Sequence, residues 1–177
     1  MEYKMRHNFT LLAVCTALIT ATGCSGDDTK AKDLEKPEIV DGDVPSPIDC
    51  EVYHIGEEIP FRYTFTDNGE LGNFNLEIHH NFDHHTHSTS AGDCPLDPKK
   101  DPVNPWVYNQ DFAIPDGQKS YNAKVDIPIP EGIDTGDYHF MVRLTDKAGW
   151  QQLKAISIKI RAKEQYSKQL KINLLCD

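Results

Sequence analysis

The sequence predicts an all-β fold in which antiparallel strands pack as a sandwich. Apolar and polar residues alternate with a period of two in several short segments, which is the pattern of half-buried strands. No segment has the periodicity of an amphipathic helix, and turn residues separate the segments at the short spacing typical of a β-sandwich. With 177 residues, the chain is expected to form one such domain.

The expected strands follow from the alternating segments in chain order. They are residues 57–66, 71–79, 120–129, 137–145 and 150–161. Pro128 and Pro130 place the third of these at a sheet edge or mark its end, because proline cannot donate to a ladder. A first strand is expected near 37–43 or 50–55. In the C-terminal tail, alternation predicts an edge strand at Leu170, Ile172 and Leu174.

A tyrosine corner narrows the prediction to an immunoglobulin-like sandwich. The stretch "GIDTGDYHF" places Asp134, Gly136 and Tyr138 just before a strand, where the tyrosine hydroxyl can bond to backbone a few residues upstream. The same strand ends in "TDKAGW", which resembles the turn between the last two strands of bacterial Ig-like domains.

The N-terminus has the features of a secretory signal. Lys4 and Arg6 precede an apolar segment, Leu11 to Thr20, that is too short to span a bilayer comfortably. The following "ATGC" resembles a bacterial lipobox, which makes Cys24 the expected acylated residue and residues 1–23 a lipoprotein signal peptide. The alternative is an ordinary signal peptide that leaves Cys24 unmodified.

Residues 24–36 are expected to form a flexible acidic tether, because they are small or charged and have little to bury. Asp27 and Asp28 follow the cysteine and resemble the surface-export signal of lipoproteins in anaerobic gut Gram-negatives. We therefore expect an outer-membrane lipoprotein exposed at the cell surface, with a periplasm-facing anchor as the alternative. Residues 37–177 then form the single Ig-like domain.

Cysteine usage predicts one disulfide in this domain. If Cys24 is lipidated, Cys50, Cys94 and Cys176 remain, and export favours oxidation. We expect Cys50 to pair with Cys94, because both lie well inside the domain. A Cys94–Cys176 bridge is the alternative.

Net charge and motifs exclude several function classes. The chain has 18 basic and 28 acidic residues, a formal net charge of −10, which argues against nucleic-acid binding and is compatible with attracting cations. It has no Gly-x-Ser-x-Gly elbow, no His-Glu-x-x-His pair and no glycine-rich phosphate loop. We therefore expect no enzyme activity and no catalytic residues.

A histidine cluster is the strongest functional signal. "HHNFDHHTHS" begins at residue 79 and holds five of the eight histidines in the chain. Imidazole suits transition metals, and a site needs three or four converging ligands. The expected ligands are His79 with two or three of His84, His85 and His87. Asp83 and Glu77 are expected as further ligands or as carboxylates that orient the imidazoles.

Strand phases add a histidine from elsewhere in the chain. Because Ile78 and Phe140 face the core, His79 and His139 face outward. Their strands are antiparallel neighbours in an Ig-like sandwich, so His79 should lie beside His139. We expect a transition metal here, zinc or copper ahead of nickel or iron, with binding that weakens below about pH 6.5 as histidine protonates. The alternatives are a purely structural metal and a loop that is merely polar.

Residues 80–119 are expected to form a long proline-rich loop, and such loops are often functional. A Cys50–Cys94 bridge would hold this loop against the body. A second hypothesis is a glycan- or protein-binding adhesion module. Its aromatic platform would consist of Trp106, Tyr108, Phe112 and Trp150, unless these side chains simply pack against the domain.

Three stretches carry a family resemblance. "HHNFDHHTH", "NPW" and "TGDYHFMVRLTDKAGWQ" resemble a family of Ig-like lipoproteins of anaerobic gut Gram-negatives that is described as a domain of unknown function, over about residues 37–162. The resemblance implies a lipid-anchored envelope protein and no particular activity. With the histidine cluster, the prediction is a metal-binding lipoprotein that captures or delivers a transition metal beside a TonB-dependent transporter.

Overall fold

The computed structural model describes residues 32–86 and 94–163, and all strands below belong to the unit that begins at Asp33. In these two ranges the fold is all-β, as predicted, and no helix is long and apolar enough to cross a membrane. The strands are β1 (Glu38–Val40), β2 (Glu51–His54), β3 (Glu58–Thr66), β4 (Leu71–His80), β5 (Tyr108–Ala113), β6 (Ser120–Pro128), β7 (Gly136–Asp146) and β8 (Gln151–Arg161).

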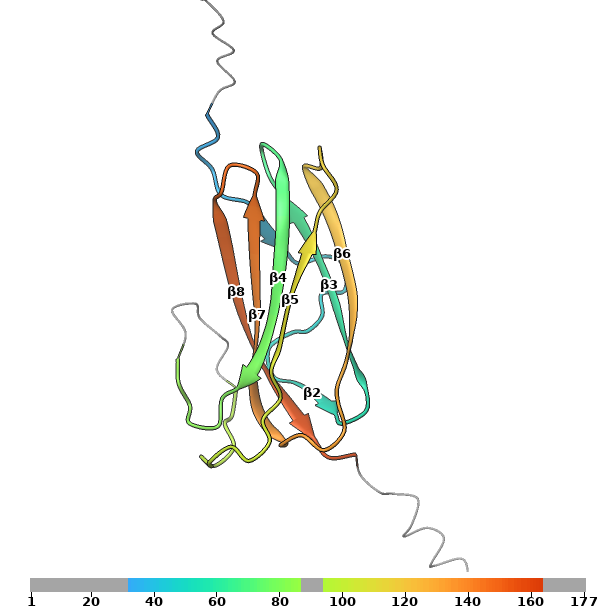
Figure 1. Ribbon diagram of the computed structural model, residues 1–177, viewed down its shortest axis with the longest axis vertical. Helices are drawn as coiled ribbons and strands as arrows, with labels where there is room; N and C mark the ends of the chain where they lie inside the picture. The colour runs from blue at the N-terminus through green and yellow to red at the C-terminus, as the bar shows by residue number, and fades with distance from the viewer. Residues whose placement is uncertain (1–31, 87–93, 164–177) are drawn as a thin grey trace, which may run out of the picture. The chain divides into compact units, whose positions relative to one another are not determined.

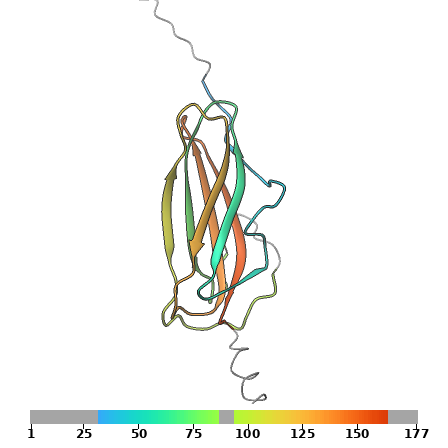
Figure 2. The same ribbon diagram turned by 90° about the vertical axis from the view of Figure 1, so that its right-hand side faces the viewer.

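The strands form two sheets that face each other as an Ig-like sandwich (Figure 1). The smaller sheet has the order β1-β3-β6, and the larger has the order β2-β8-β7-β4-β5. Strand β2 runs parallel to β8, while the other paired strands are antiparallel. In Figure 2, β3 and β6 lie in front of the larger sheet.

The five strands predicted from alternation are confirmed to within one residue at each end. Strand β3 shows why: Ile59, Phe61, Tyr63 and Phe65 are buried, and the residues between them are partly exposed. Both candidates for the first strand exist, as β1 and β2. Strand β6 lies at the edge of its sheet, which explains why Pro128 is tolerated in it.

Strand β5 was not predicted, because the sequence analysis assigned the whole of 80–119 to a loop. It pairs with the outer edge of β4, and only its two aromatic residues are even partly buried. Its polar residues bond across the strand pair: Nδ2 of Asn75 donates to Oδ1 of Asn109 at 2.7 Å and to Oδ1 of Asp111 at 2.9 Å. An exposed edge strand has no apolar alternation for sequence reasoning to detect.

Aromatic side chains join the two sheets in the core. Phe61 of β3 is fully buried, and its ring centroid lies 6.0 Å from that of Phe74 on β4 and 5.7 Å from that of Phe140 on β7. Both contacts are stacked, a geometry that adds to the stabilisation from area burial. The core therefore bridges the layers near the middle of β7, between two ends that are free to carry polar sites.

The predicted tyrosine corner is present at the start of β7. The hydroxyl of Tyr138 donates to the Asp134 carbonyl at 2.6 Å and accepts from the Trp106 N–H at 3.3 Å. Burial raises the pKa of Tyr138 to about 12, so the hydroxyl keeps the proton that it donates. It thus ties the β6–β7 connection to the segment that precedes β5.

We expect Tyr138→Phe to lower the free energy of unfolding by about 1–2 kcal/mol, because one buried and one partly buried backbone group lose a partner while the ring remains. Urea denaturation monitored by tryptophan fluorescence measures this loss. Tyr108→Phe is the matched control: its hydroxyl bonds to Gln110 at the surface, and its removal should change stability by less than about 0.5 kcal/mol. Equal losses in the two variants would contradict the corner's role.

Candidate metal site

A disulfide anchors the histidine-rich loop to the body. Cys50 and Cys94 are bonded with an S–S distance of 2.02 Å, so the predicted pairing is confirmed and Cys94–Cys176 is excluded. The N–H of Cys50 donates to the carbonyl of Ser157 on β8 at 2.8 Å. The end of the loop is therefore tied to the larger sheet through a covalent bond and a backbone hydrogen bond.

An ionic cluster holds the next part of the loop on the outer face of β7 and β8. Asp97 binds the guanidinium of Arg161 through two hydrogen bonds, 2.6 and 2.8 Å, and its N–H donates to Oδ2 of Asp137 at 2.7 Å. Lys159 lies between both carboxylates and pairs with Asp137 and, at 3.3 Å, with Asp97. The Arg161 hydrogen bonds hold the pKa of Asp97 below its usual range. The loop thus covers the surface from which His139 projects.

Sequence reasoning missed this ionic cluster. On a strand of a sandwich, charged residues that alternate with apolar ones normally mark the solvated face, and Lys159 and Arg161 follow that pattern. The only available signal was the length of the proline-rich loop, which has to cover some surface of the sheet.

Strands β4 and β7 bring together the two histidines that the strand phases predicted to be neighbours. His79 lies opposite His139 in the antiparallel register, and their ring centroids are 5.6 Å apart. Ile78 and Phe140, which flank this pair, are fully buried in the core. Both imidazoles therefore project from the outer face of the larger sheet.

One loop histidine joins this pair. The ring of His85 lies 5.5 Å from that of His79 and 5.2 Å from that of His139, between centroids. We call these three residues the His79 cluster. The exposed fraction of His139 is only 4%, and those of the His79 and His85 side chains are 19% and 35%. The cluster is thus a partly buried site that opens to solvent on the side of His85.

Two carboxylates orient the imidazoles. Oε1 of Glu77 lies 3.1 Å from Nδ1 of His79, and Oδ1 of Asp83 accepts a hydrogen bond from Nδ1 of His85 at 2.6 Å. The bond from His85 lowers the pKa of Asp83 to about 2, so this carboxylate remains ionised. With its proton on Nδ1, the neutral ring of His85 presents Nε2 as the nitrogen that would bind a metal.

His139 has the opposite tautomer. Its Nε2 donates to the backbone carbonyl of His85 at 3.3 Å, because a carbonyl can only accept. In the neutral ring this makes Nδ1 the nitrogen with the lone pair. His85 and His139 can therefore each offer one imidazole nitrogen while the other nitrogen is held by a protein oxygen, an arrangement typical of metal-ligating histidines.

The remaining predicted site residues lie differently. His84 has a backbone φ of 60°, and its Nε2 donates to the carbonyl of Asp97 at 2.8 Å, so it ties the loop to itself and stays outside the cluster. Asp83 partners His85 rather than lying among the three rings. His80, from the other face of β4, packs on Phe82 at 4.8 Å. His87, Cys24, Cys176, the signal peptide and the C-terminal edge strand lie outside the described residues.

The aromatic residues proposed as a binding platform do not share one surface. Trp106 is buried beside Tyr108, with ring centroids 6.2 Å apart, and Phe112 stacks on Phe74 at 4.9 Å. Trp150 is 44% exposed but lies in the β7–β8 turn, at the end of β7 opposite to Trp106. The first three therefore pack against the domain.

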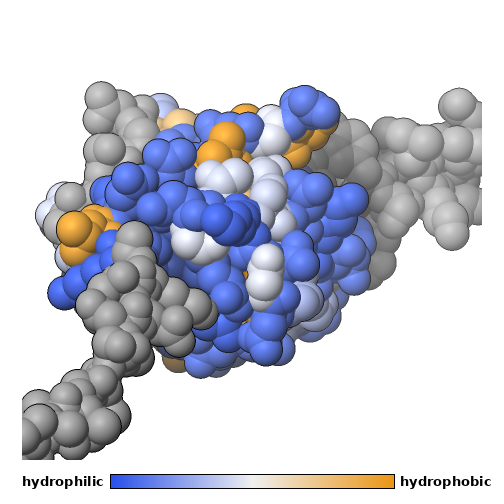
Figure 3. Space-filling view, turned by 90° about the horizontal axis from the view of Figure 1, so that it is seen from above, coloured by the Kyte–Doolittle hydropathy of each residue, from blue (hydrophilic) through white to orange (hydrophobic). Residues whose placement is uncertain are grey.

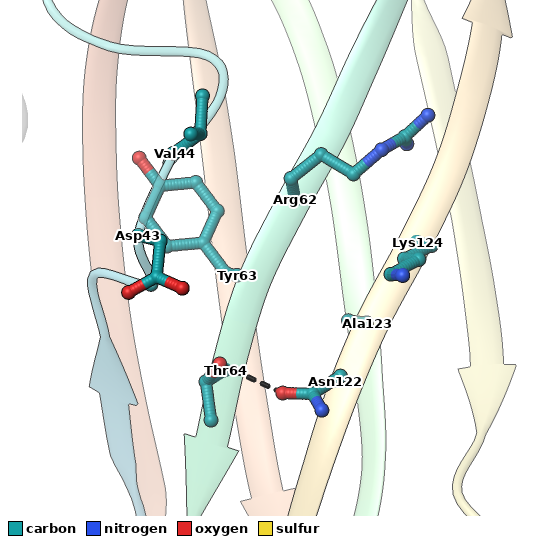
Figure 4. A pocket seen from close by; sticks show the side chains of 9 residues that line it. Asp43, Val44, Arg62, Tyr63, Thr64, Asn122, Ala123 and Lys124 are labelled. Atoms are coloured by element: carbon teal, nitrogen blue, oxygen red, sulfur yellow. Dashed lines mark hydrogen bonds between the residues drawn. The ribbon is translucent and has the colours of Figure 1, made fainter.

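A concave surface lies on the smaller sheet, away from the His79 cluster (Figure 4). This open groove runs between the 42–44 segment and strands β3 and β6, and Arg62, Lys124 and Asp43 line it. Its floor includes the hydrogen bond from Thr64 to Asn122, 2.9 Å long. The groove has no histidine, and its charges partly compensate one another.

Comparison with known proteins identifies the family and little more. A family model described as a domain of unknown function (DUF4625) matches residues 22–161. No curated protein matches the chain. Among solved structures, the chain is similar to OgpA from Akkermansia muciniphila, with 16% identity over 72% of this chain and a TM-score of 0.41. The chain spans only 30% of that protein's length.

Proposed function

Because this chain belongs to the DUF4625 family, which carries no assigned activity, we propose its function from its own side chains. We propose that the Ig-like domain binds a transition metal ion, zinc or copper, through His79, His85 and His139. The observation that carries this proposal is the convergence of three imidazoles from two strands and a loop, with ring centroids 5.2–5.6 Å apart.

The spacing of the ring centroids is close to that of three imidazoles on a single metal ion. The ring nitrogens do not all lie within 4.8 Å of one another, so binding would also require the rings to turn toward the ion. A zinc–imidazole bond is about 2 Å long and the ring centre lies roughly 1 Å further out, so three imidazoles on a tetrahedral ion have centres about 5 Å apart. The observed separations differ from that value by a few tenths of an ångström. A fourth ligand would come from water, from the rest of the loop or from a partner that exchanges the metal.

The surroundings of the cluster favour binding as well. Glu77 and Asp83 add negative charge beside His79 and His85, which raises the affinity for a cation, and the hydrogen bond to Asp83 fixes the tautomer of His85. An all-nitrogen set of ligands suits zinc and copper better than calcium or magnesium. With a lipid anchor at Cys24, the domain would hold this metal at the outer membrane, where it would capture it for, or deliver it to, a TonB-dependent transporter.

Calorimetric titration of the full chain in detergent with ZnCl₂ and with CuSO₄ tests the proposal, together with elemental analysis of the purified protein. We expect submillimolar binding at one site per chain. His79→Gln and His85→Ala should each weaken binding by at least about 100-fold, because each removes one of three ligands. Glu77→Gln should weaken it by about 10–100-fold, because the orienting carboxylate is lost.

His84→Asn is the matched control, because His84 belongs to the same loop but bonds to Asp97 instead of the other imidazoles. Asparagine tolerates the left-handed backbone conformation of that position, so the loop should keep its path. This variant should bind metal as the wild type does. Binding no tighter than millimolar in the wild type, or equal loss in His84→Asn and His85→Ala, would refute the proposal.

A further inference from the structure

Three aspartates meet at the other end of β7, remote from the His79 cluster. They are Asp33 in the segment before β1, Asp67 in the β3–β4 turn and Asp146 at the end of β7. One carboxylate oxygen of each lies within 4.8 Å of the other two. We call these residues the Asp33 cluster. The end of the sandwich that carries it, seen from above, is mostly hydrophilic (Figure 3).

Two of the three carboxylates are only half satisfied. Oδ2 of Asp67 accepts from the N–H of Gly69 at 2.9 Å, and Oδ1 of Asp146 accepts from the N–H of Trp150 at 2.8 Å. Their other oxygens, Oδ1 of Asp67 and Oδ2 of Asp146, are buried and have no hydrogen-bond partner among the described residues. Asp146 as a whole is 96% buried, at 4% exposure. Burying a carboxylate oxygen without a hydrogen-bond donor costs free energy, and a bound cation would remove that cost.

Protein cations do not supply that ligand. None of the three aspartates forms an ion pair with a described residue. The lysines of the neighbouring turns are engaged elsewhere: Lys147 pairs with Asp116 at 2.7 Å, and Lys119 donates to the carbonyl of Asn68 at 2.7 Å. Burial raises the pKa of Asp67, and the charges of Asp33 and Asp146 add to this rise, as expected for carboxylates that repel one another.

We propose that the Asp33 cluster is a calcium site. Three carboxylates form an all-oxygen set of ligands, which hard cations prefer. Two oxygens bound to one Ca²⁺ can lie up to about 5 Å apart, since each Ca–O distance is about 2.4 Å, and the separations within the cluster meet this limit. The ion would offset the mutual repulsion of the aspartates and would satisfy the two buried oxygens.

The bound ion would join three segments that are distant in the sequence. Asp33 is held at present by its backbone carbonyl, which accepts from the indole N–H of Trp150 at 3.1 Å. The carboxylate of Asp33 occupies space that a side chain at position 69 would fill, because a Cβ on Gly69 would lie 2.5 Å from Oδ2 of Asp33. Calcium would therefore fasten the segment that enters the sandwich to the β3–β4 and β7–β8 turns.

Calcium titration of the full chain in detergent, after removal of metals with a chelator, tests the proposal. Isothermal calorimetry with CaCl₂ should give one site per chain in the micromolar to millimolar range. At 10 mM CaCl₂ the Tm should rise by about 5 °C. Tryptophan fluorescence should change with the same midpoint, because Trp150 contacts Asp33. Trp150→Phe should remove most of that change and leave calorimetric binding in place.

Replacing one carboxylate of the cluster should change stability in opposite directions without and with calcium. In chelator, Asp67→Asn should be as stable as the wild type or more stable, because one of three repelling charges is gone. In 10 mM CaCl₂, it should show no rise in Tm and become the less stable protein. Asp116→Asn is the matched control at the same end of the domain and should keep the full rise. Asp33→Asn repeats the test at an N-terminal position should Asp67→Asn fail to fold.

Two outcomes would overturn the proposal: no calcium-dependent shift in the wild type at 10 mM, or an undiminished shift in both Asp67→Asn and Asp33→Asn. The calcium site is independent of the His79 cluster. His85→Ala should therefore lose zinc binding and keep the calcium response. An equal response to MgCl₂ would also contradict the assignment to calcium.

Discussion

Replacing Cys50 and Cys94 together by serine should lower the free energy of unfolding by about 4 kcal/mol. The bond closes a loop of 44 residues, and the chain-entropy relation converts a loop of this length to about that value. Urea denaturation of the double variant and of the wild type, each with and without reductant, measures the loss. Reduced wild type should match the variant, whereas reductant should not change the variant.

The disulfide variant should also bind zinc more weakly. Cys94 holds the end of the loop that carries His85, so breaking the bond lets this ligand move away from the two strand histidines. The free-energy cost of ordering the loop would then be met on metal binding, which lowers the affinity. If stability fell by less than about 1 kcal/mol, or if zinc affinity stayed unchanged, the loop would be held by its ionic contacts alone.

Asp137→Ala is expected to lower the free energy of unfolding by about 3 kcal/mol. Asp137 is 4% exposed, pairs with Lys159 and accepts the N–H of Asp97 at 2.7 Å. Its removal leaves Lys159, whose side chain is 12% exposed, with Asp97 as its one acidic partner in the described part of the chain. It also deprives the N–H of Asp97 of its acceptor. The penalty arises mainly from the charge left behind in a covered site.

The exposed ion pair between Arg62 and Asp126 is the matched comparison for this prediction. Asp126 is half exposed on β6, where water can replace its partner. Asp126→Ala should therefore cost less than about 1 kcal/mol in the same urea experiment. Comparable losses at Asp126 and Asp137 would show that the loop does not shield its ionic cluster from solvent.

Much of the fold could be predicted because alternation is a local property. The core-facing residues of β3, and those of β7 up to Leu144, are apolar or aromatic, so the period of two appears in the sequence itself. The tyrosine corner followed from its place just before one of these strands, and Cys50 and Cys94 were the expected pair because both lie inside the domain. Strand β5 escaped because it is an exposed edge strand with a polar sequence, and nothing local separates such a strand from a loop.

The candidate site was only partly predictable. The pairing of His79 with His139 followed from strand phases and from the antiparallel order of two neighbours. The choice among loop histidines did not, because it depends on the path of an irregular chain. His85 turns toward the sheet, while His84, at a left-handed backbone position, bonds to Asp97.

The sequence by itself determined the sandwich and the meeting of two histidines on adjacent strands, since both depend on periodicity and strand order. It favoured the Cys50–Cys94 bond over Cys94–Cys176, and the structure decided between them. Only the tertiary structure decided that Asp97 fastens the loop over His139 and that Asp33 reaches Asp67 and Asp146. Those contacts join segments far apart in the chain through single charged side chains. A single charge looks the same in sequence whether it faces water or another carboxylate, so its role appears only when the chain is folded.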